Sequence, residues 1–228
     1  MRSFLILRLD GPMQSWGLHS FEDYRPTNHF PTRSGLIGLF GACLGIERAD
    51  QDRLSALNKS VEIAIRDDQG LDSGNRDELV ASSEKSPQVA TDFHTVLQAR
   101  KVGGRVNRYP VVSRREYLFD ARFTIAIGER AGAQFNLERI AKAAQHPCFT
   151  PVLGRRSCPL ARPLLETTKP IEAADVIAAL MRVEPVGGTI YAEEPVSDQP
   201  LGLRDVPRAT PFRQFDQRLI YVHREAGK

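Results

Sequence analysis

Apolar and polar positions follow a two-residue period in several segments of the chain, which is the spacing of strands. The first apolar stretch, SFLILRLD at 3–10, is nearly continuous and is closed by Gly11-Pro12, which predicts a buried first strand. VEIAIRD predicts a half-buried strand at about 61–66, and YLFDARFTIAIG predicts another at about 117–127. Two late strands are expected within EPVGGTIYAEEPV and RLIYVHRE.

Apolar residues at helical spacing predict helices between these strands. The first helix follows Thr32 or Ser34, either of which can cap it, and a short helix follows Asp50. A third, amphipathic helix begins after Asn136 and ends before Pro147. A further short helix is expected at 171–181.

Four glycines lie at helical intervals near the first helix: Gly35, Gly38, Gly41 and Gly45. Glycine costs about 1 kcal/mol per helical position relative to alanine, so a helix with four of them is expected to gain from a close approach. The partner in that approach is either the sheet, through tight packing, or a ligand.

The predicted order is strand, helix, strand, strand, helix, strand, with an insertion before the third strand. This order is typical of a ferredoxin-like or RNA-recognition-motif fold, which is an α+β fold. The connection at 11–31 holds the single tryptophan and is long enough to be functional. Residues 67–92 are polar and predict an exposed loop.

The length of 228 residues suffices for one large domain or a domain with a substantial insertion, and it can bury a substantial core. The composition, with 41% hydrophobic and 26% charged residues, is ordinary for a soluble globular protein. No apolar run approaches the roughly 20 residues that cross a membrane. The N-terminal stretch breaks at Arg8 and Asp10 and lacks the features of a signal peptide. The cysteines Cys43, Cys148 and Cys158 have no paired spacing, which predicts reduced thiols in a cytoplasmic protein and no Cys-only zinc site.

Positive charge is concentrated in segments, because the formal net charge is only +3. Residues 100–115, RKVGGRVNRYPVVSRR, hold six cations and no carboxylate: Arg100, Lys101, Arg105, Arg108, Arg114 and Arg115. Gly103-Gly104 resembles the tip of a β-hairpin, and Tyr109 adds an aromatic ring. Such an arm can meet phosphates with its cations and a base with its tyrosine. The alternative is a solvated hairpin that its charge keeps soluble.

A second basic segment is TPVLGRRSCP at 150–159, where Arg155 and Arg156 follow Gly154 between two prolines. Glycine permits conformations closed to other residues, and proline stops regular structure, so the segment predicts a fixed loop that presents two cations to an anion. Arginine makes bidentate contacts with phosphate, and a glycine-led turn offers backbone N–H donors. The alternative is that one arginine pairs with an acid inside the protein.

Motifs for catalysis are scarce, since the chain has no GxxxxGK[ST], HExxH, GxSxG or paired CxxC. Metal-independent RNA cleavage needs a base and an acid at the scissile phosphate. His94, with Lys101 and Tyr109, could form such a set, although the spacing is unspecific and a single histidine is more often structural.

Six blocks of the chain, in order, resemble the CasD family of subunits of the type I-E CRISPR complex Cascade: MRSFLILRLDGPMQSWG, PTRSGLIGLFGACLGI, DFHTVL, REYLFDARFT, TPVLGRRSCPL and EPVGGTIYAEE. The resemblance implies a single RAMP-type domain over 1–228, related to the RNA-recognition motif. It also implies a β-hairpin thumb within about 85–115 and a C-terminal β extension at about 183–228. The chain departs from the family pattern at 67–92 and at 100–110.

The resemblance further implies a role without catalysis, cofactor or metal. CasD-like subunits bind the repeat-derived 5′ handle of the CRISPR RNA (crRNA) and cap the backbone filament of a ribonucleoprotein complex for antiviral defence. The implied partners are the crRNA, the neighbouring backbone and large subunits of Cascade and, in the assembled complex, target DNA, with no membrane. In related type I-C systems the equivalent subunit processes precursor CRISPR RNA, so a metal-independent endoribonuclease is the alternative. A third hypothesis is a protein–protein scaffold whose basic segments meet acidic partners.

Charge, position and the matching blocks together give the expected RNA-binding residues: Gln14, Ser15, Trp16, Arg25, Arg33, Ser34, Arg100, Lys101, Arg105, Arg108, Tyr109, Arg155 and Arg156.

Overall fold

A seven-stranded antiparallel sheet forms the centre of the chain, in the order β10-β1-β9-β6-β11-β13-β12. The structure is a computed structural model, and it describes residues 1–18, 23–69, 71, 88–100, 104–195, 200–210 and 214–224. The strands of this sheet are β1 (Arg2–Asp10), β6 (Val61–Asp67), β9 (Arg122–Glu129), β10 (Ile171–Ala173), β11 (Thr189–Ala192), β12 (Leu201–Pro207) and β13 (Phe215–Arg224). Strand β1 confirms the predicted first strand.

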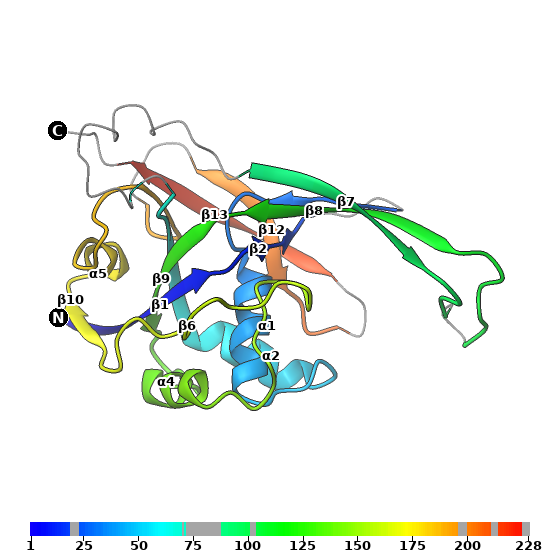
Figure 1. The fold of residues 1–228 in the computed structure, drawn as a ribbon. Coiled ribbons are helices and arrows are strands. Elements are labelled where there is room, and N and C mark those ends of the chain that lie inside the picture. Colours follow the sequence, from blue (N-terminus) through cyan, green and yellow to red (C-terminus); the bar gives the residue numbers. More distant parts are fainter. Residues whose placement is uncertain are drawn as a thin grey trace.

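Helices cover both faces of the sheet (Figure 1). Leu5, Leu7 and Leu9 of β1 face a large core that includes side chains of α1 (Arg33–Cys43), α2 (Gln51–Ser60) and α4 (Leu137–Gln145). Phe4 and Ile6, which point the other way, pack in a smaller core against α5 (Val176–Met181). The near-continuous apolar run of β1 is therefore explained by burial on both faces.

The predicted helix starts are confirmed by their caps. Thr32 Oγ1 accepts a hydrogen bond from the backbone of Gly35 at 3.3 Å, and Asp50 accepts from that of Arg53 at 3.1 Å. Asn136 caps α4 in the same way. Gly45 lies just beyond α1 with a φ of 67°, so it ends the helix instead of continuing its glycine face.

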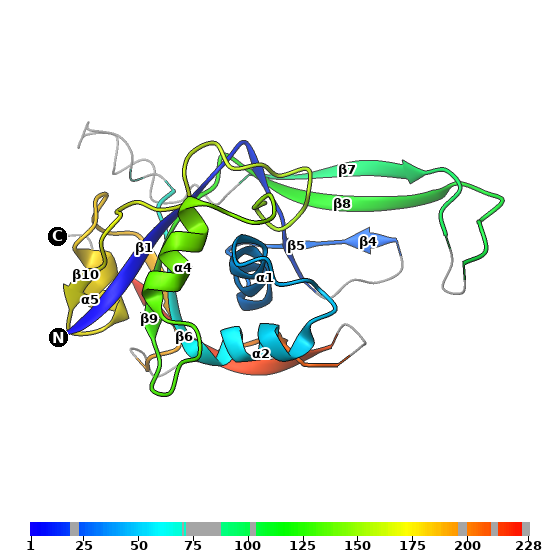
Figure 2. The same cartoon turned by 90° about the horizontal axis from the view of Figure 1, so that it is seen from below.

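A long hairpin projects from the body of the molecule (Figures 1 and 2). Its strands are β7 (Gln88–Val96) and β8 (Val111–Phe119), which pair from Gln88↔Phe119 to Val96↔Val111. Strand β8 also pairs with β2 (Met13–Gln14) at its end near the body and, in parallel, with β4 (Tyr24–Arg25) at its middle. A further pair joins β3 (Trp16–Gly17) to β5 (Thr27–Asn28). The connection at 11–31 thus holds short strands that fix the hairpin to the body.

Three sequence predictions of secondary structure were wrong in part. The strand expected at 117–127 is the end of β8 and the start of β9, with Asp120 in the turn at a φ of 53°. Residues 88–92 of the expected polar loop belong to β7, and 72–87 lie outside the described residues. The helix expected at 171–181 is the strand β10 followed by α5, which Asp175 caps. The α+β expectation is confirmed as a mixed fold with antiparallel sheets.

Candidate nucleic-acid interface

The loop Thr150–Pro159, called here the double-arginine loop, is held by backbone contacts at several points. Val152 bridges to Pro159, and Leu153 bonds to Ser15 and Cys158 at 3.1 and 2.8 Å. Gly154 has a φ of 87°, and a Cβ built there would lie 1.9 Å from the carbonyl oxygen of Ser15. Only glycine therefore fits where this loop crosses the N-terminal connection.

The two arginines of the loop have different surroundings. Arg155 is half-buried: it donates to the carbonyl of Arg25 at 3.1 Å, and its guanidinium carbon lies 5.0 Å from the ring centroid of Tyr117. Arg156 is exposed and makes no hydrogen bond or ion pair with the residues that the structure describes. Arg155 therefore braces the loop, and Arg156 is the cation that it presents.

Arg156 lines two adjoining cavities of about 590 and 630 Å³, which together form what we call the α1 groove. Both cavities are also lined by Arg48 and by the exposed face of α1 at Gly38 and Ala42. The first continues to Ser34 and Arg208, and the second to Phe149 and Glu47.

The glycines of α1 serve both purposes that the sequence left open. A Cβ at Gly35 would meet the Trp16 ring at 2.8 Å, and one at Gly41 would meet Leu54 at 2.9 Å, so these two allow tight packing. A Cβ at Gly38 would meet nothing within 4 Å, because this position faces the α1 groove. Gly38 thus leaves the helix backbone open to a ligand.

The charge of the α1 groove is positive. Arg48 is exposed and, like Arg156, has no hydrogen-bonded or ionic side-chain partner in the described part of the chain. Arg208 pairs with Asp216 at 2.5 Å, and Glu47 is the acid on the rim of the second cavity. Two cations therefore remain for an anionic ligand, a pattern that suits phosphate.

Several residues expected at the interface are buried in the protein. Gln14 is fully buried and donates to the carbonyls of Leu9 and Ala121, at 3.1 and 2.6 Å, while accepting from Trp16 Nε1 at 3.1 Å. Ser15 is buried and donates to the carbonyl of Glu116. Ser15 and the equally buried Trp16 contact the double-arginine loop, and Gln14 holds Trp16 in place. Direct RNA contacts by these three residues remain a prediction.

Arg33 is also buried, with 3% of its surface exposed. Its guanidinium pairs with Glu193 at 2.9 Å and bonds to Asn58, while its backbone N–H donates to Asp205 at 2.6 Å. Burial lowers the pKa of Arg33 to about 10, with Glu193 acting in the opposite direction. The geometry gives Arg33 a bracing role between α1 and the C-terminal strands. Ser34, half-buried, does line the α1 groove.

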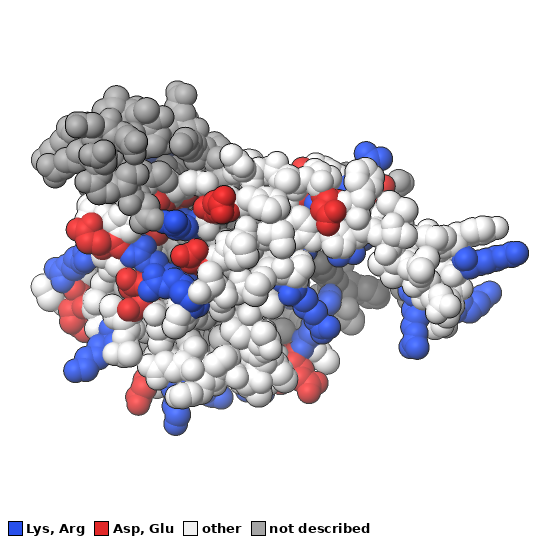
Figure 3. Space-filling view, in the orientation of Figure 1, with Lys and Arg blue, Asp and Glu red and all other residues white. Residues whose placement is uncertain are grey.

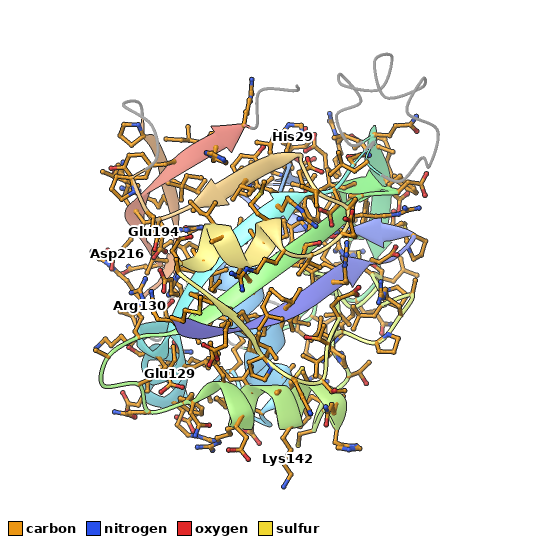
Figure 4. All side chains as sticks on the ribbon, turned by 90° about the vertical axis from the view of Figure 1, so that its left-hand side faces the viewer. His29, Glu129, Arg130, Lys142, Glu194 and Asp216 are labelled. Carbon is orange, nitrogen blue, oxygen red and sulfur yellow. The ribbon has the colours of Figure 1, made fainter. Side chains whose placement is uncertain are left out.

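The bracing cluster around Arg33 extends to the flank of the molecule. Arg218 pairs with Asp205 at 2.7 Å and with Glu193 at 3.1 Å, and Arg130 also reaches Glu193. Figure 4 shows Arg130 on the flank that carries Glu129 and Glu194. These ion pairs tie β12 and β13 to the start of α1.

The basic arm lies at the far end of the hairpin, where Figure 3 shows blue side chains projecting without red ones. Arg100, Arg105 and Arg108 are exposed, and Tyr109 exposes 72% of its surface with Arg108 stacked 5.9 Å from its ring centroid. Gly104 has a φ of 85°, which suits the predicted turn. Lys101 and Gly103 lie outside the described residues. Arg25 is exposed in β4, which pairs with the middle of β8.

His94 does not meet Tyr109, which lies beyond the end of the β7–β8 ladder. Its Nε2 is 3.1 Å from the hydroxyl of Tyr117 and 2.8 Å from Asp92. The sequence-based grouping of His94 with Tyr109 is therefore corrected to a pair with Tyr117, which is buried in the root of the hairpin. Among the described residues, no cluster of His, Cys, Asp and Glu could hold a metal ion. No helix in the described part of the chain is long and apolar enough to cross a membrane.

Arg48, Arg208 and Tyr117 were missed from the sequence. Arg48 lies in a mixed run with Glu47, Asp50 and Asp52, where a search for acid-free segments finds nothing. Tyr117 lies within a strand pattern, where a tyrosine is ordinary. The sequence did indicate Gly38, because the helical spacing of the glycines was compatible with a close approach to a ligand.

Comparisons with known proteins agree with the resemblance seen in the sequence. The chain matches the family model of the CRISPR-associated protein (Cas_Cas5) over residues 4–226. It is 47% identical over 226 residues to the CRISPR system Cascade subunit CasD of Escherichia coli (strain K12), covering 97% of this chain and 96% of that protein.

Two solved structures are also similar. One chain of a CRISPR RNA-guided surveillance complex superposes with a TM-score of 0.73 at 29% identity, over 97% of this chain and 90% of that one. A Cas protein crystal structure gives a TM-score of 0.64 at 25% identity, over 97% and 94%. The resemblance to CasD predicted from the sequence blocks is confirmed, and the chain belongs to the Cas5 family of CRISPR-associated proteins.

Proposed function

We propose that this chain is a non-catalytic subunit of a Cascade-type CRISPR complex that holds the 5′ handle of the crRNA and caps the backbone filament. The observation that carries the proposal is the α1 groove, where Arg48 and Arg156 face a cavity without acidic partners among the described residues. Phosphates of a single-stranded RNA fit such a groove, since arginine contacts position the backbone and Gly38 lets it approach the helix. The 47% identity to a Cascade subunit supports the same role.

The proposal includes a finer description of the fold. The order β10-β1-β9-β6, with α1 between β1 and β6 and α4 between β9 and β10, supports a ferredoxin-like core. The hairpin β7–β8, at 88–119, is then the thumb that was expected within about 85–115, and β11 to β13 form the C-terminal extension at 183–228, all in one domain.

The partners follow from the same proposal. The exposed basic arm at Arg100, Arg105, Arg108 and Tyr109 suits RNA at the boundary of the handle, with Lys101 expected beside it. Neighbouring backbone and large subunits of Cascade, and target DNA in the assembled complex, are the other partners that we propose. We expect the complex to act in the cytoplasm.

Replacing the two groove cations tests the proposal. The full chain is titrated with a fluorescent repeat-derived handle RNA of its host at several salt concentrations, and the salt slope of log K is measured. Arg48→Ala with Arg156→Ala removes two phosphate contacts, which predicts weaker binding and a slope smaller by about 1.4. Gly38→Phe, which fills the groove from a position with open space, should weaken binding without unfolding the chain.

Arg53→Ala is the matched control, because Arg53 is an exposed arginine of α2 that pairs with Asp50 at 3.6 Å. Its affinity and slope should equal those of the wild type. An unchanged slope in the double variant would remove the groove from the proposal. Absence of RNA binding by the wild type, alone and in the assembled complex, would favour the protein–protein scaffold instead.

A metal-independent endoribonuclease is the second candidate, favoured by the contact between His94 and Tyr117, two groups that can exchange protons. Against it, only 3% of the Tyr117 surface is exposed, so a scissile phosphate has poor access to this pair. Incubation of the chain with labelled precursor RNA in EDTA distinguishes the endoribonuclease from the non-catalytic subunit. Discrete products that disappear in His94→Ala would establish the enzyme, whereas intact RNA would support the non-catalytic role.

A further inference from the structure

Tyr117 lies where three segments of the chain meet. Its own strand, β8, forms one arm of the hairpin. Its hydroxyl is 3.1 Å from His94 Nε2 on the other arm and 3.5 Å from Ser157 Oγ on the double-arginine loop. Its ring carries the guanidinium of Arg155 at 5.0 Å. One buried side chain therefore joins the hairpin, which carries the basic arm at its far end, to the double-arginine loop.

The register of the hairpin explains this reach. Tyr117 lies opposite Ala90, Asp92 opposite Arg115, and His94 opposite Ser113, so alternate pairs place Tyr117, Asp92 and His94 on one face. The side chains of that face form a chain of contacts, in which His94 also meets Asp92 at 2.8 Å. The phenol extends along the strands from the root of the hairpin toward its outer half.

In the double-arginine loop, the orientation of the Arg155 side chain depends on the Tyr117 ring. One of its terminal nitrogens donates to the carbonyl of Arg25 in β4, and the other is buried without a partner among the described residues. Stacking on Tyr117 and the hydrogen bond to Arg25 together orient the guanidinium. Arg156, the next residue, follows the backbone that Arg155 fixes, so the presented cation is positioned through Tyr117.

We propose that Tyr117 is a positioning residue that couples the hairpin to the double-arginine loop, so that RNA held by either segment strengthens the grip of the other. This inference rests on the proposed function, because it needs RNA at both segments. If the Tyr117 hydroxyl only filled space, Tyr117→Phe would leave the coupling between the two segments unchanged. The hydroxyl has a partner on each side, and removing it breaks the link while the ring and its stacking on Arg155 remain.

A double-mutant cycle measures the coupling directly. Handle RNA with its first spacer nucleotides is titrated against the full chain, Tyr109→Ala at the hairpin tip, Arg156→Ala in the loop, and the double variant. The same four affinities are then measured in a Tyr117→Phe background. The two losses should be non-additive by about fivefold or more with Tyr117 present, which is the lower end of typical coupling. The non-additivity should fall in the Tyr117→Phe background, because the hydroxyl link between His94 and Ser157 is then missing while the ring still stacks on Arg155.

Two further variants keep the test decisive. Tyr221→Phe, at a half-buried tyrosine of β13, is the matched control and should preserve the coupling. If Tyr117→Phe fails to fold, His94→Ala breaks the same link from the hairpin side and should reduce the coupling as well. Additive losses in the wild type, or coupling of undiminished size in the variants, would overturn the inference. A wild type without RNA affinity would instead overturn the proposed function.

Discussion

Arg155 and Arg156 are neighbours in the sequence, yet one supports the loop and the other faces the α1 groove. The sequence predicted a fixed loop with two cations, and the fixed loop is confirmed. It could not separate the two arginines, because the division depends on Tyr117 and Arg25, which come from distant segments. Local sequence specifies that a turn forms, whereas tertiary contacts decide which way each side chain points.

Gly154 gives a prediction at the scale of one residue. Gly154→Ala combines a positive φ with a Cβ that would overlap the Ser15 carbonyl, so the backbone has to shift. We expect a loss in the free energy of unfolding of about 1–3 kcal/mol, together with weaker handle binding. Urea unfolding and RNA titration measure the two effects.

Gly132→Ala is the control for this prediction, since Gly132 has a φ of 74° but open space around its Cβ position. It reports the cost of the positive φ alone and should leave RNA binding unchanged. Equal losses of stability in the two variants would show that the crossing with Ser15 contributes nothing.

At the scale of elements, sequence patterns worked where local signals agree with tertiary structure. The apolar run of β1 and the capping residues Thr32, Asp50 and Asn136 place a strand and three helices correctly. Patterns did not separate β8 from β9, because the apolar alternation continues through the turn at Asp120. The strand β12 was missed altogether, since its sequence LGLRDVP has little alternation and its pairing with β13 decides its conformation.

The α1 groove could be predicted only in parts. Its double-arginine loop and glycine-bearing helix carried signals, whereas the proximity of Arg48 to Arg156 is a product of the fold. Arg33 was expected to bind RNA because it is a cation inside a matching block. The sequence alone could not show that the fold places an acidic partner beside its guanidinium.

The contribution of Asp205 to the attachment of the β12–β13 ribbon to α1 gives a prediction at the scale of elements. Asp205 accepts from the backbone of Arg33 and pairs with Arg218, and all three are largely buried. Asp205→Ala leaves the guanidinium of Arg218 and the backbone N–H of Arg33 short of a buried partner, which predicts a loss of about 3–5 kcal/mol in the free energy of unfolding. Urea unfolding of the full chain measures it.

Asp216→Ala is the matched control, because the Asp216–Arg208 pair lies in the same ribbon but is about half exposed. It should cost about 1 kcal/mol or less. Similar losses for both aspartates would mean that the ribbon is not fixed to α1 through Asp205.

At the scale of the whole molecule, the body and the hairpin have different designs. The body is a sheet with a core on each face, and the hairpin projects from it with exposed apolar and basic side chains (Figures 1 and 3). A two-stranded ribbon is only marginally stable alone, so its root has to be fixed by β2, β4 and the chain of contacts through Tyr117. The body therefore supplies stability, and the hairpin supplies reach.

The stability of the whole chain should depend on pH through two acids of the body. Burial raises the pKa of Asp67 to about 6, and burial together with a hydrogen bond to Glu62 raises that of Glu194 to about 7. Their unfolded pKa values are about 3.9 and 4.3, so between about pH 4 and 7 the folded chain binds more protons than the unfolded one. The free energy of unfolding contributed by these acids is therefore present below about pH 4 and is lost as the pH rises to 7.

Urea unfolding at intervals from pH 5 to 8 should show this decline in the wild type and a flatter profile in the double variant Asp67→Asn with Glu194→Gln. Both amides can still take part in hydrogen bonds, including the one that Asp67 accepts from the backbone of Gln69 at 3.0 Å, but neither titrates. Leu219→Ala, at a half-exposed apolar residue of β13, changes no ionisable group and should keep the wild-type slope. Parallel profiles for the wild type and the double variant would contradict the prediction, because the decline would then come from other groups.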